Sequence, residues 1–442
     1  MTNLTKHILS ALLMGAVLAS CSDNDAPTPD ATDWQNPTVK NLWNGDNAEK
    51  WTVANAYVSD IVIPTYKDLA TSADRLYEAS VRIKENVSAG RLTDADLQAA
   101  CDAFSQARVY WERSEAFLYG AASDYNIDPH IDSWPLDQSQ MAGFLTNSQM
   151  VGGLNSADPI DFVRRNNNEF DTALGFHGIE FVLWRDGKPR TAEAFLADET
   201  LEAFAGRGVN GQTEAAFLVA VAGDLRDHCY ELEYAWGGEA IASAHKERVN
   251  AIGLGVRAMD GHGYYYNADM LLSGYSRISS AYLETTLTNM TAVLCNILVG
   301  GCSNICAEVA DQKMGQAYRV ATGQGGEDDA SDYIESPYSK HSFIDYQGNI
   351  YSIKHSLYGS RNDAEATPKS NSLLTYLQKK GYGDAQKLDA SLTEAIATLQ
   401  QCIDSKVAFV EAPGSADVKA AIDAVLTLDE ELNAAAEWLA KQ

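Results

Sequence analysis

The chain has 442 residues, of which 45% are hydrophobic, and its formal net charge is −28. This length exceeds one ordinary domain and is long enough to bury two sizeable cores. The acidic balance argues against nucleic acid or an anionic membrane surface as a partner, because both would repel the chain.

The N-terminus is typical of a secretory leader. Lys6 precedes an apolar run from Ile8 to Ala19 that is too short to span a bilayer as a mature helix. The run ends in Leu18-Ala19-Ser20-Cys21, which looks like a lipobox. We therefore predict a lipoprotein signal peptide over residues 1–20, acylation of Cys21, and an outer-membrane lipoprotein that faces the periplasm or the cell surface. An ordinary secretory signal with an incidental cysteine is the alternative.

Residues 21–47 are rich in Asp, Pro, Thr and Asn and predict a disordered tether. Helical periodicity then dominates and strand patterns are scarce. The expected helices cover residues 54–87 with a kink at Pro64, 93–120, 170–185, 214–236, 269–299, 302–321, 371–380, 385–409 and 416–439. We therefore expect an all-α protein of two antiparallel helical bundles packed together, over 48–252 and 253–442, consistent with an old duplication.

Cysteine usage permits disulfides but gives little support for a structural zinc site. Six cysteines follow Cys21, namely Cys101, Cys229, Cys295, Cys302, Cys306 and Cys402. An even number can pair in an oxidising compartment, while the absence of a CxxC motif argues against zinc. We expect most of them to be buried as small hydrophobic residues. The sequence neither favours nor excludes one disulfide involving Cys302 or Cys306.

The segment Gly175-Phe176-His177-Gly178-Ile179-Glu180 carries the clearest metal-ligand pattern. If it is helical, the spacing places His177 and Glu180 on one face. An imidazole with a carboxylate suits iron(II) or zinc. The pair lies in an apolar segment, where polar groups need a partner. A satisfied core histidine is the plainer alternative.

Two irregular polar stretches also predict functional residues. In the first, residues 111–137, Glu115 and Asp137 could reach a metal, although Asp128 and Asp132 can equally form turns around Pro129. In the second, polar residues fall mostly three apart and could line one side of a pocket, although a capped helix start explains the two later serines as well. These residues are Glu335, Ser336, Ser339, Ser342 and Asp345.

Several stretches together resemble the imelysin family over nearly the whole mature chain. They are Trp111-x-x-Ser114-Glu115-x-Phe117, Trp134-Pro135-Leu136-Asp137, the GxHxxE element at Gly175, His177 and Glu180, Lys313-Met314, and Glu335-Ser336-x-Tyr338-Ser339-x-x-Ser342-x-x-Asp345. Tyr338 stands where phenylalanine is expected. The resemblance implies two helical bundles with a site between them, where the GxHxxE element meets the Glu-Ser stretch.

The resemblance also implies roles for individual residues. His177, Glu180 and Glu115 become metal ligands for a divalent ion, iron or zinc. The pocket residues become Asp137, Glu335, Ser336, Ser339, Ser342 and Asp345. The family was named for a proposed metallopeptidase activity, and related members are tied to iron acquisition.

The visible chemistry favours binding over catalysis. The zinc-peptidase motif His-Glu-x-x-His and the Gly-x-Ser-x-Gly elbow are both absent from the sequence. The other mature-chain histidines, His130, His228, His245, His262, His341 and His355, stand in no ligand spacing with His177. We expect a lipoprotein that binds iron, or another metal or metal-containing ligand, and takes part in its uptake with a transport partner in the envelope. A metal-dependent peptidase and a structural surface protein are the alternatives.

Overall fold

The computed structural model describes residues 46–254 and 290–442. The predicted signal peptide, Cys21, nearly all of the tether and the 269–289 part of the expected helix over 269–299 lie outside these residues.

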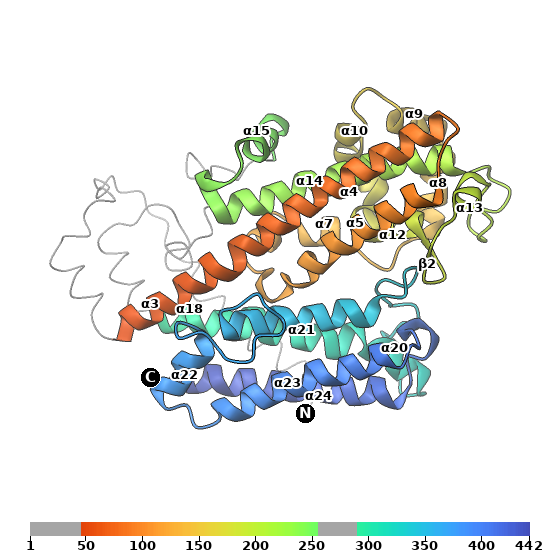
Figure 1. Ribbon diagram of the computed structural model, residues 1–442. Coiled ribbons are helices and arrows are strands. Elements are labelled where there is room, and N and C mark those ends of the chain that lie inside the picture. Colours follow the sequence, from red (N-terminus) through yellow and green to blue (C-terminus); the bar gives the residue numbers. More distant parts are fainter. Residues whose placement is uncertain (1–45, 255–289) are drawn as a thin grey trace.

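The regular structure of the described residues is helical apart from one short hairpin, and two halves of the chain form two layers of helices (Figure 1). The first half contains α3 (Asp46–Ala56), η2 (Tyr57–Val62), α4 (Ile63–Ser88), α5 (Asp94–Glu112), η3 (Glu115–Phe117), α6 (Ala121–Asp124), α7 (Asp128–Ile131), α8 (Gln138–Thr146), α9 (Ser148–Leu154), α10 (Pro159–Arg165), α11 (Asn167–Phe170), η4 (Asp171–Ala173), α12 (Gly175–Leu183), α13 (Ala192–Leu196), α14 (Gly211–Gly237), η5 (Gly238–Ala240) and α15 (Ser243–Ile252). The second half contains α18 (Met290–Asn296), η6 (Ile297–Ser303), α19 (Asn304–Ala307), η7 (Glu308–Lys313), α20 (Gly315–Ala321), α21 (Ser342–Tyr358), α22 (Leu373–Lys380), α23 (Ala385–Asp404), η8 (Phe409–Glu411) and α24 (Ala416–Leu439). A short antiparallel hairpin of β1 (Trp184–Arg185) and β2 (Lys188–Pro189) follows α12, with Trp184 opposite Pro189. The predicted all-helical fold is confirmed.

The first half is organised around α4, which packs along both α5 and α14. Its buried apolar residues recur every three or four positions, as at Leu69, Ala73 and Leu76. Pro64 lies in the first turn of α4, directly after the π-helical segment η2, and has no N–H to donate to a carbonyl of the preceding turn. The predicted irregularity at Pro64 is therefore a change from π- to α-helix.

The second half is built around a long helical run, Met290–Ala321, that includes the π-helical segments η6 and η7. Among the described helices, this run alone is long and apolar enough to cross a membrane by length and composition. More than half of the most apolar stretch of this run is buried inside the protein. Since it packs against α24 and α21, the core of this half explains its composition.

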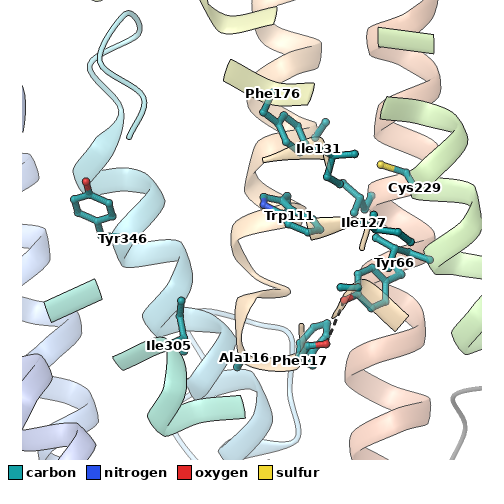
Figure 2. Close-up of a cluster of buried hydrophobic side chains, with 14 of the residues drawn as sticks. Tyr66, Trp111, Ala116, Phe117, Ile127, Ile131, Phe176, Cys229, Ile305 and Tyr346 are labelled. Atoms are coloured by element: carbon teal, nitrogen blue, oxygen red, sulfur yellow. Dashed lines mark hydrogen bonds between the residues drawn. The ribbon is translucent and has the colours of Figure 1, made fainter. Parts of the chain in front are cut away.

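The two halves meet where α21 and η6 pack against α5 and η3. Gly301 permits the close approach, because a Cβ there would lie 2.1 Å from the carbonyl oxygen of Ala116. Figure 2 shows the buried side chains near this contact, with Trp111 and Phe117 in the first half and Tyr346 in the second. In addition, α3 contacts α18 and α22, so the start of the described chain lies against the second half.

The structure decides the open question of a disulfide and differs from the expected helices in detail. The six cysteines among the described residues are all free. Cys302 and Cys306 are buried in one continuous helical run, where residues four apart lie about 5–6 Å apart at Cβ, too far for a disulfide. The expected helix over 170–185 is broken into α11, η4 and α12, and that over 385–409 ends at Asp404. Helix α21 begins within the second polar stretch, at Ser342, and continues to Tyr358, whereas only a helix start was considered from the sequence.

Candidate site between the two halves

The two glycines of the GxHxxE element allow α12 to pack deep in the protein. Gly175 has a φ of +66°, and a Cβ there would lie 1.8 Å from the carbonyl oxygen of Ile131. A Cβ on Gly178 would lie 2.0 Å from the carbonyl oxygen of Ala173. Every residue from Gly175 to Leu183 is buried. The glycines therefore let α12 approach the residues before it closely enough to bury the motif.

His177 lies between two carboxylates. Its Nε2 is 3.0 Å from Oδ1 of Asp132, and its Nδ1 is 3.7 Å from Oε2 of Glu180. Burial alone would lower the pKa of His177, but the interactions with Asp132 and Glu180 outweigh it and raise the pKa to about 9. At neutral pH the ring is protonated, so His177 could bind a metal only after losing a proton.

Glu180 connects the two halves of the chain. Its Oε1 accepts a hydrogen bond of 2.6 Å from the backbone N–H of Ser339, while its Oε2 is buried without a hydrogen-bond partner. The structure thus brings the GxHxxE element to the Glu-Ser stretch.

The serine hydroxyls of the Glu-Ser stretch, residues 335–345, form hydrogen bonds with other groups of the same stretch. The hydroxyl of Ser342 donates to the carbonyl oxygen of Glu335, and that of Ser336 donates to Asp345. The hydroxyl of Ser339 donates to the carbonyl oxygen of Ser336. These bonds hold the loop before α21, with Ser342 as the first residue of that helix.

Arg108 of α5 supplies a buried positive charge at the centre of a network of charged side chains that joins the two halves, called the buried network below. It is 3% exposed, and its guanidinium contacts Asp132, Glu112 and Glu335. Its Nε lies 3.6 Å from Asp345. Two of these four carboxylates come from the second half, so the guanidinium joins both halves.

Lys313 of η7 supplies a second buried positive charge. Its Nζ lies 3.3 Å from Glu335 and 3.8 Å from Glu115. The ammonium also lies 5.9 Å from the centre of the Trp134 ring, within the range of a cation–π contact.

A pocket of about 190 Å³ opens beside this network, between the two halves. Its polar lining includes Glu115, Asp128, Asp132, Glu308, Lys313 and Tyr333. Burial and neighbouring carboxylates raise the pKa of Asp128 to about 7, and burial raises that of Glu115 well above its usual range. The carboxylates of the pocket therefore repel one another when ionised, and an added cation would relieve this repulsion.

The predicted site residues divide between the pocket and the network. Glu115 lines the pocket, and the buried network contains His177, Glu180, Glu335, Ser336, Ser339, Ser342 and Asp345. Asp137 does not join them. It is exposed, and its side chain caps α8 by accepting from the backbone N–H of Gln140. Aspartate is one of the residues preferred at the N-cap of a helix.

Arg108, Glu112 and Glu308 were not predicted as site residues from the sequence, and Asp132 was considered only as a possible turn residue. Asp132 is in fact the residue shared by two groups whose donor atoms lie within 4.8 Å of one another. One group is completed by His177 and Glu335, the other by Glu112 and Glu115. The polar stretch around Asp132 was a usable signal, whereas Arg108 is one polar residue on an ordinary amphipathic helix.

Known proteins resemble the chain in both sequence and fold. The model of the Imelysin (Peptidase_M75) family matches residues 62–435. "Iron-regulated protein A" of Synechococcus elongatus is 24% identical over 355 residues, which cover 80% of this chain and 76% of that protein.

Two solved structures share the fold. One, from Parabacteroides distasonis and provisionally named an iron-regulated protein A precursor, has a TM-score of 0.65 at 23% identity and covers 89% of this chain and 96% of its own. An imelysin-like protein from Psychrobacter arcticum has a TM-score of 0.51 at 13% identity, covering 88% and 94%. The family match extends over most of the residues that form both halves and their shared site, and it confirms the resemblance noted in the sequence: the chain belongs to the imelysin family.

Proposed function

We propose that this imelysin-family chain binds a metal cation, iron first among the candidates, in the pocket between its halves and takes part in iron uptake at the cell envelope. The choice of iron is supported by the name of the related iron-regulated protein A. The envelope location is supported by the lipobox-like sequence that ends at Cys21.

The observation that carries the proposal is the excess of acidic groups around the pocket. The cationic side chains there are Arg108, Lys313 and His177. They are outnumbered by the carboxylic acids Glu112, Glu115, Asp128, Asp132, Glu180, Glu308, Glu335 and Asp345. Buried carboxylates must be protonated or compensated by positive charge. A bound metal cation would supply that charge.

The donor set favours a hard cation. The pocket presents carboxylate oxygens from Glu115, Asp128 and Glu308, and oxygen donors suit hard ions such as ferric iron or manganese. His177, held against Asp132, would act as a positioning residue for that carboxylate instead of a ligand. No comparable observation supports a peptidase, since the pocket lining contains no histidine.

The test is a metal titration of the purified full-length protein in detergent, stripped of metal beforehand. Ferric nitrilotriacetate, Mn²⁺ and Zn²⁺ are added at neutral pH, and bound metal is measured by equilibrium dialysis with elemental analysis. The double variant Glu115→Gln, Glu308→Gln removes two pocket carboxylates and is expected to weaken binding at least tenfold. The matched control is Glu327→Gln, Glu430→Gln, which makes the same change at two exposed positions.

Two results would overturn the proposal. One is stoichiometric binding that is equal in the pocket variant and the wild type, and the other is negligible binding in both. The second result would favour a purely structural role for the buried network.

A further inference from the structure

A second group of histidines and carboxylates lies inside the first half, between α7 and α14. His130 comes from α7, and Asp224 and His228 come from α14, one helical turn apart. Asp128, on the same short helix as His130, lines the pocket described above. The pocket lining includes neither His130 nor the two α14 residues, so this group is separate from it.

The three side chains converge. Nε2 of His130 lies 2.6 Å from Oδ2 of Asp224, and Nε2 of His228 lies 3.9 Å from Oδ1 of the same carboxylate. The two imidazole rings are 4.3 Å apart at their centres. One donor atom from each of the three residues lies within 4.8 Å of the others. Only modest movement is needed to place all three around one ion.

Two of the donor atoms are buried without a hydrogen-bond partner. These are Oδ1 of Asp224 and Nε2 of His228, in residues that are 1% and 7% exposed. Nδ1 of His228 lies 3.1 Å from Oε2 of Glu231. If Nδ1 carries a proton and donates it to Glu231, Nε2 faces Oδ1 of Asp224. Although burial opposes it, the interactions with Glu231 and Asp224 raise the pKa of His228, so a cation that binds at Nε2 would replace a second proton there. Two facing acceptors repel unless a proton or a cation lies between them.

Arg164 is a cationic side chain outside the group that forms an ion pair with this carboxylate. Its Nε lies 3.8 Å from Oδ1 of Asp224, beyond hydrogen-bond distance, while its Nη2 is bound to Asp227 at 2.8 Å. Arg164 therefore leaves the lone pair of Oδ1 available.

His228 and Glu231 repeat the spacing of the GxHxxE element. In both pairs, Nδ1 of the histidine faces the glutamate three residues later, and Nε2 faces an aspartate. That aspartate lies outside the helix for His177 and one turn earlier on the same helix for His228. The difference is that Nε2 of His177 is hydrogen-bonded to Asp132, whereas Nε2 of His228 has no partner. A carboxylate behind the non-ligating nitrogen is the usual way in which a protein orients a metal-binding imidazole.

We propose that His130, Asp224 and His228 form a second metal site, for a divalent first-row cation such as zinc or ferrous iron. Two imidazoles and one carboxylate are softer than the carboxylate oxygens that line the pocket, and they match the ligand sets that proteins use for these ions. Three protein ligands leave at least one coordination position for water or another ligand. The side chain of His130 is 12% exposed, so the site lies close to the surface.

His245 provides a matched control. It also packs against carboxylates, with its side chain 14% exposed, but both ring nitrogens are engaged, with Nδ1 2.6 Å from Glu233 and Nε2 3.3 Å from Asp74. Its ring stacks on Tyr230 at 3.9 Å. Substituting His245 removes a comparable set of ion pairs without removing a free lone pair.

The experiment uses the full-length protein that carries Glu115→Gln and Glu308→Gln, so that binding in the pocket does not interfere. Metal-free samples are titrated with Zn²⁺ by calorimetry and with Co²⁺ by visible absorption, with and without His228→Gln, His130→Ala or His245→Gln. We expect one equivalent of Zn²⁺ to bind, at least tenfold more weakly after either His228→Gln or His130→Ala, and unchanged after His245→Gln. The visible absorption of bound Co²⁺ should disappear with the first two substitutions.

The proposal is overturned if His228→Gln and His130→Ala, both folded by circular dichroism, bind Zn²⁺ as tightly as His245→Gln does. It is also overturned if the protein without these substitutions binds no Zn²⁺. Either failure leaves the pocket proposal standing, because that proposal is tested by the glutamate variants alone.

Discussion

Replacing Arg108 by methionine should destabilise the protein strongly at pH 8 and much less at pH 5. The substitution keeps most of the side-chain volume but leaves the carboxylates around Arg108 without their nearest positive charge. Removing one member of a buried ion pair typically costs about 3–5 kcal/mol. For residues 48–442, the part expected to fold, an unfolding entropy of about 2.1 cal/mol/K per residue converts this cost to a fall in Tm of about 4–6 °C.

The pH dependence follows from the raised pKa values of the buried carboxyls. Burial already raises the pKa of Asp345 to about 7 in the presence of Arg108, and the substitution should raise it further. A carboxyl with a raised folded-state pKa binds its proton more tightly in the folded than in the unfolded chain. The free energy of unfolding of the variant therefore falls as pH rises from about 4 through the folded-state pKa.

The assay is reversible thermal unfolding of metal-free protein followed by circular dichroism at both pH values. Arg165→Met is the control, because the side chain of Arg165 is 70% exposed and its ion pair with Asp161 should contribute less than about 1 kcal/mol. The reasoning is refuted if both variants lose the same stability at pH 8, or if the loss for Arg108→Met is the same at pH 5.

Two further predictions concern the contact between the halves and the N-terminus. Gly301→Ala should destabilise the protein by about 1–3 kcal/mol in urea unfolding, because the new Cβ would collide with the carbonyl oxygen of Ala116. Gly143→Ala on α8 meets open space and should instead stabilise it by about 0.5–1 kcal/mol, so a stabilising effect at both positions would contradict the assigned close contact. Acylation of Cys21 predicts that cells fed radiolabelled palmitate label the wild-type protein and leave Cys21→Ala unlabelled. An unlabelled wild type would instead indicate an ordinary secretory signal.

Local periodicity predicted the helices whose buried face is apolar. Helix α23, for example, buries Leu388, Leu392 and Leu399 at helical spacing. The full length of α21 was missed because much of its buried face is polar. Asn349 of that helix donates to Glu112 across the contact between the halves, an interaction that no apolar pattern reveals.

The site could be predicted only where its residues are close in sequence. The pairing of His177 with Glu180 follows from helix geometry, since three residues separate them. The approach of Asp132 to His177 depends on the packing of α7 against α12. Asp137 was chosen from a neighbouring motif, but its exposed position at the start of α8 directs it to a cap.

The buried network itself is an argument for binding over structural support. Desolvating ionised groups costs several kcal/mol each, and well-packed apolar residues of similar volume often give equal or greater stability. Arg108 and Lys313 compensate only part of the surrounding carboxylates, and Oε2 of Glu180 is buried without a hydrogen-bond donor. If this contact served only to hold the halves together, neutral residues at these positions would give the protein equal or greater stability. The surplus of carboxylates beside an open pocket is instead the arrangement expected of a site that exchanges protons for a cation.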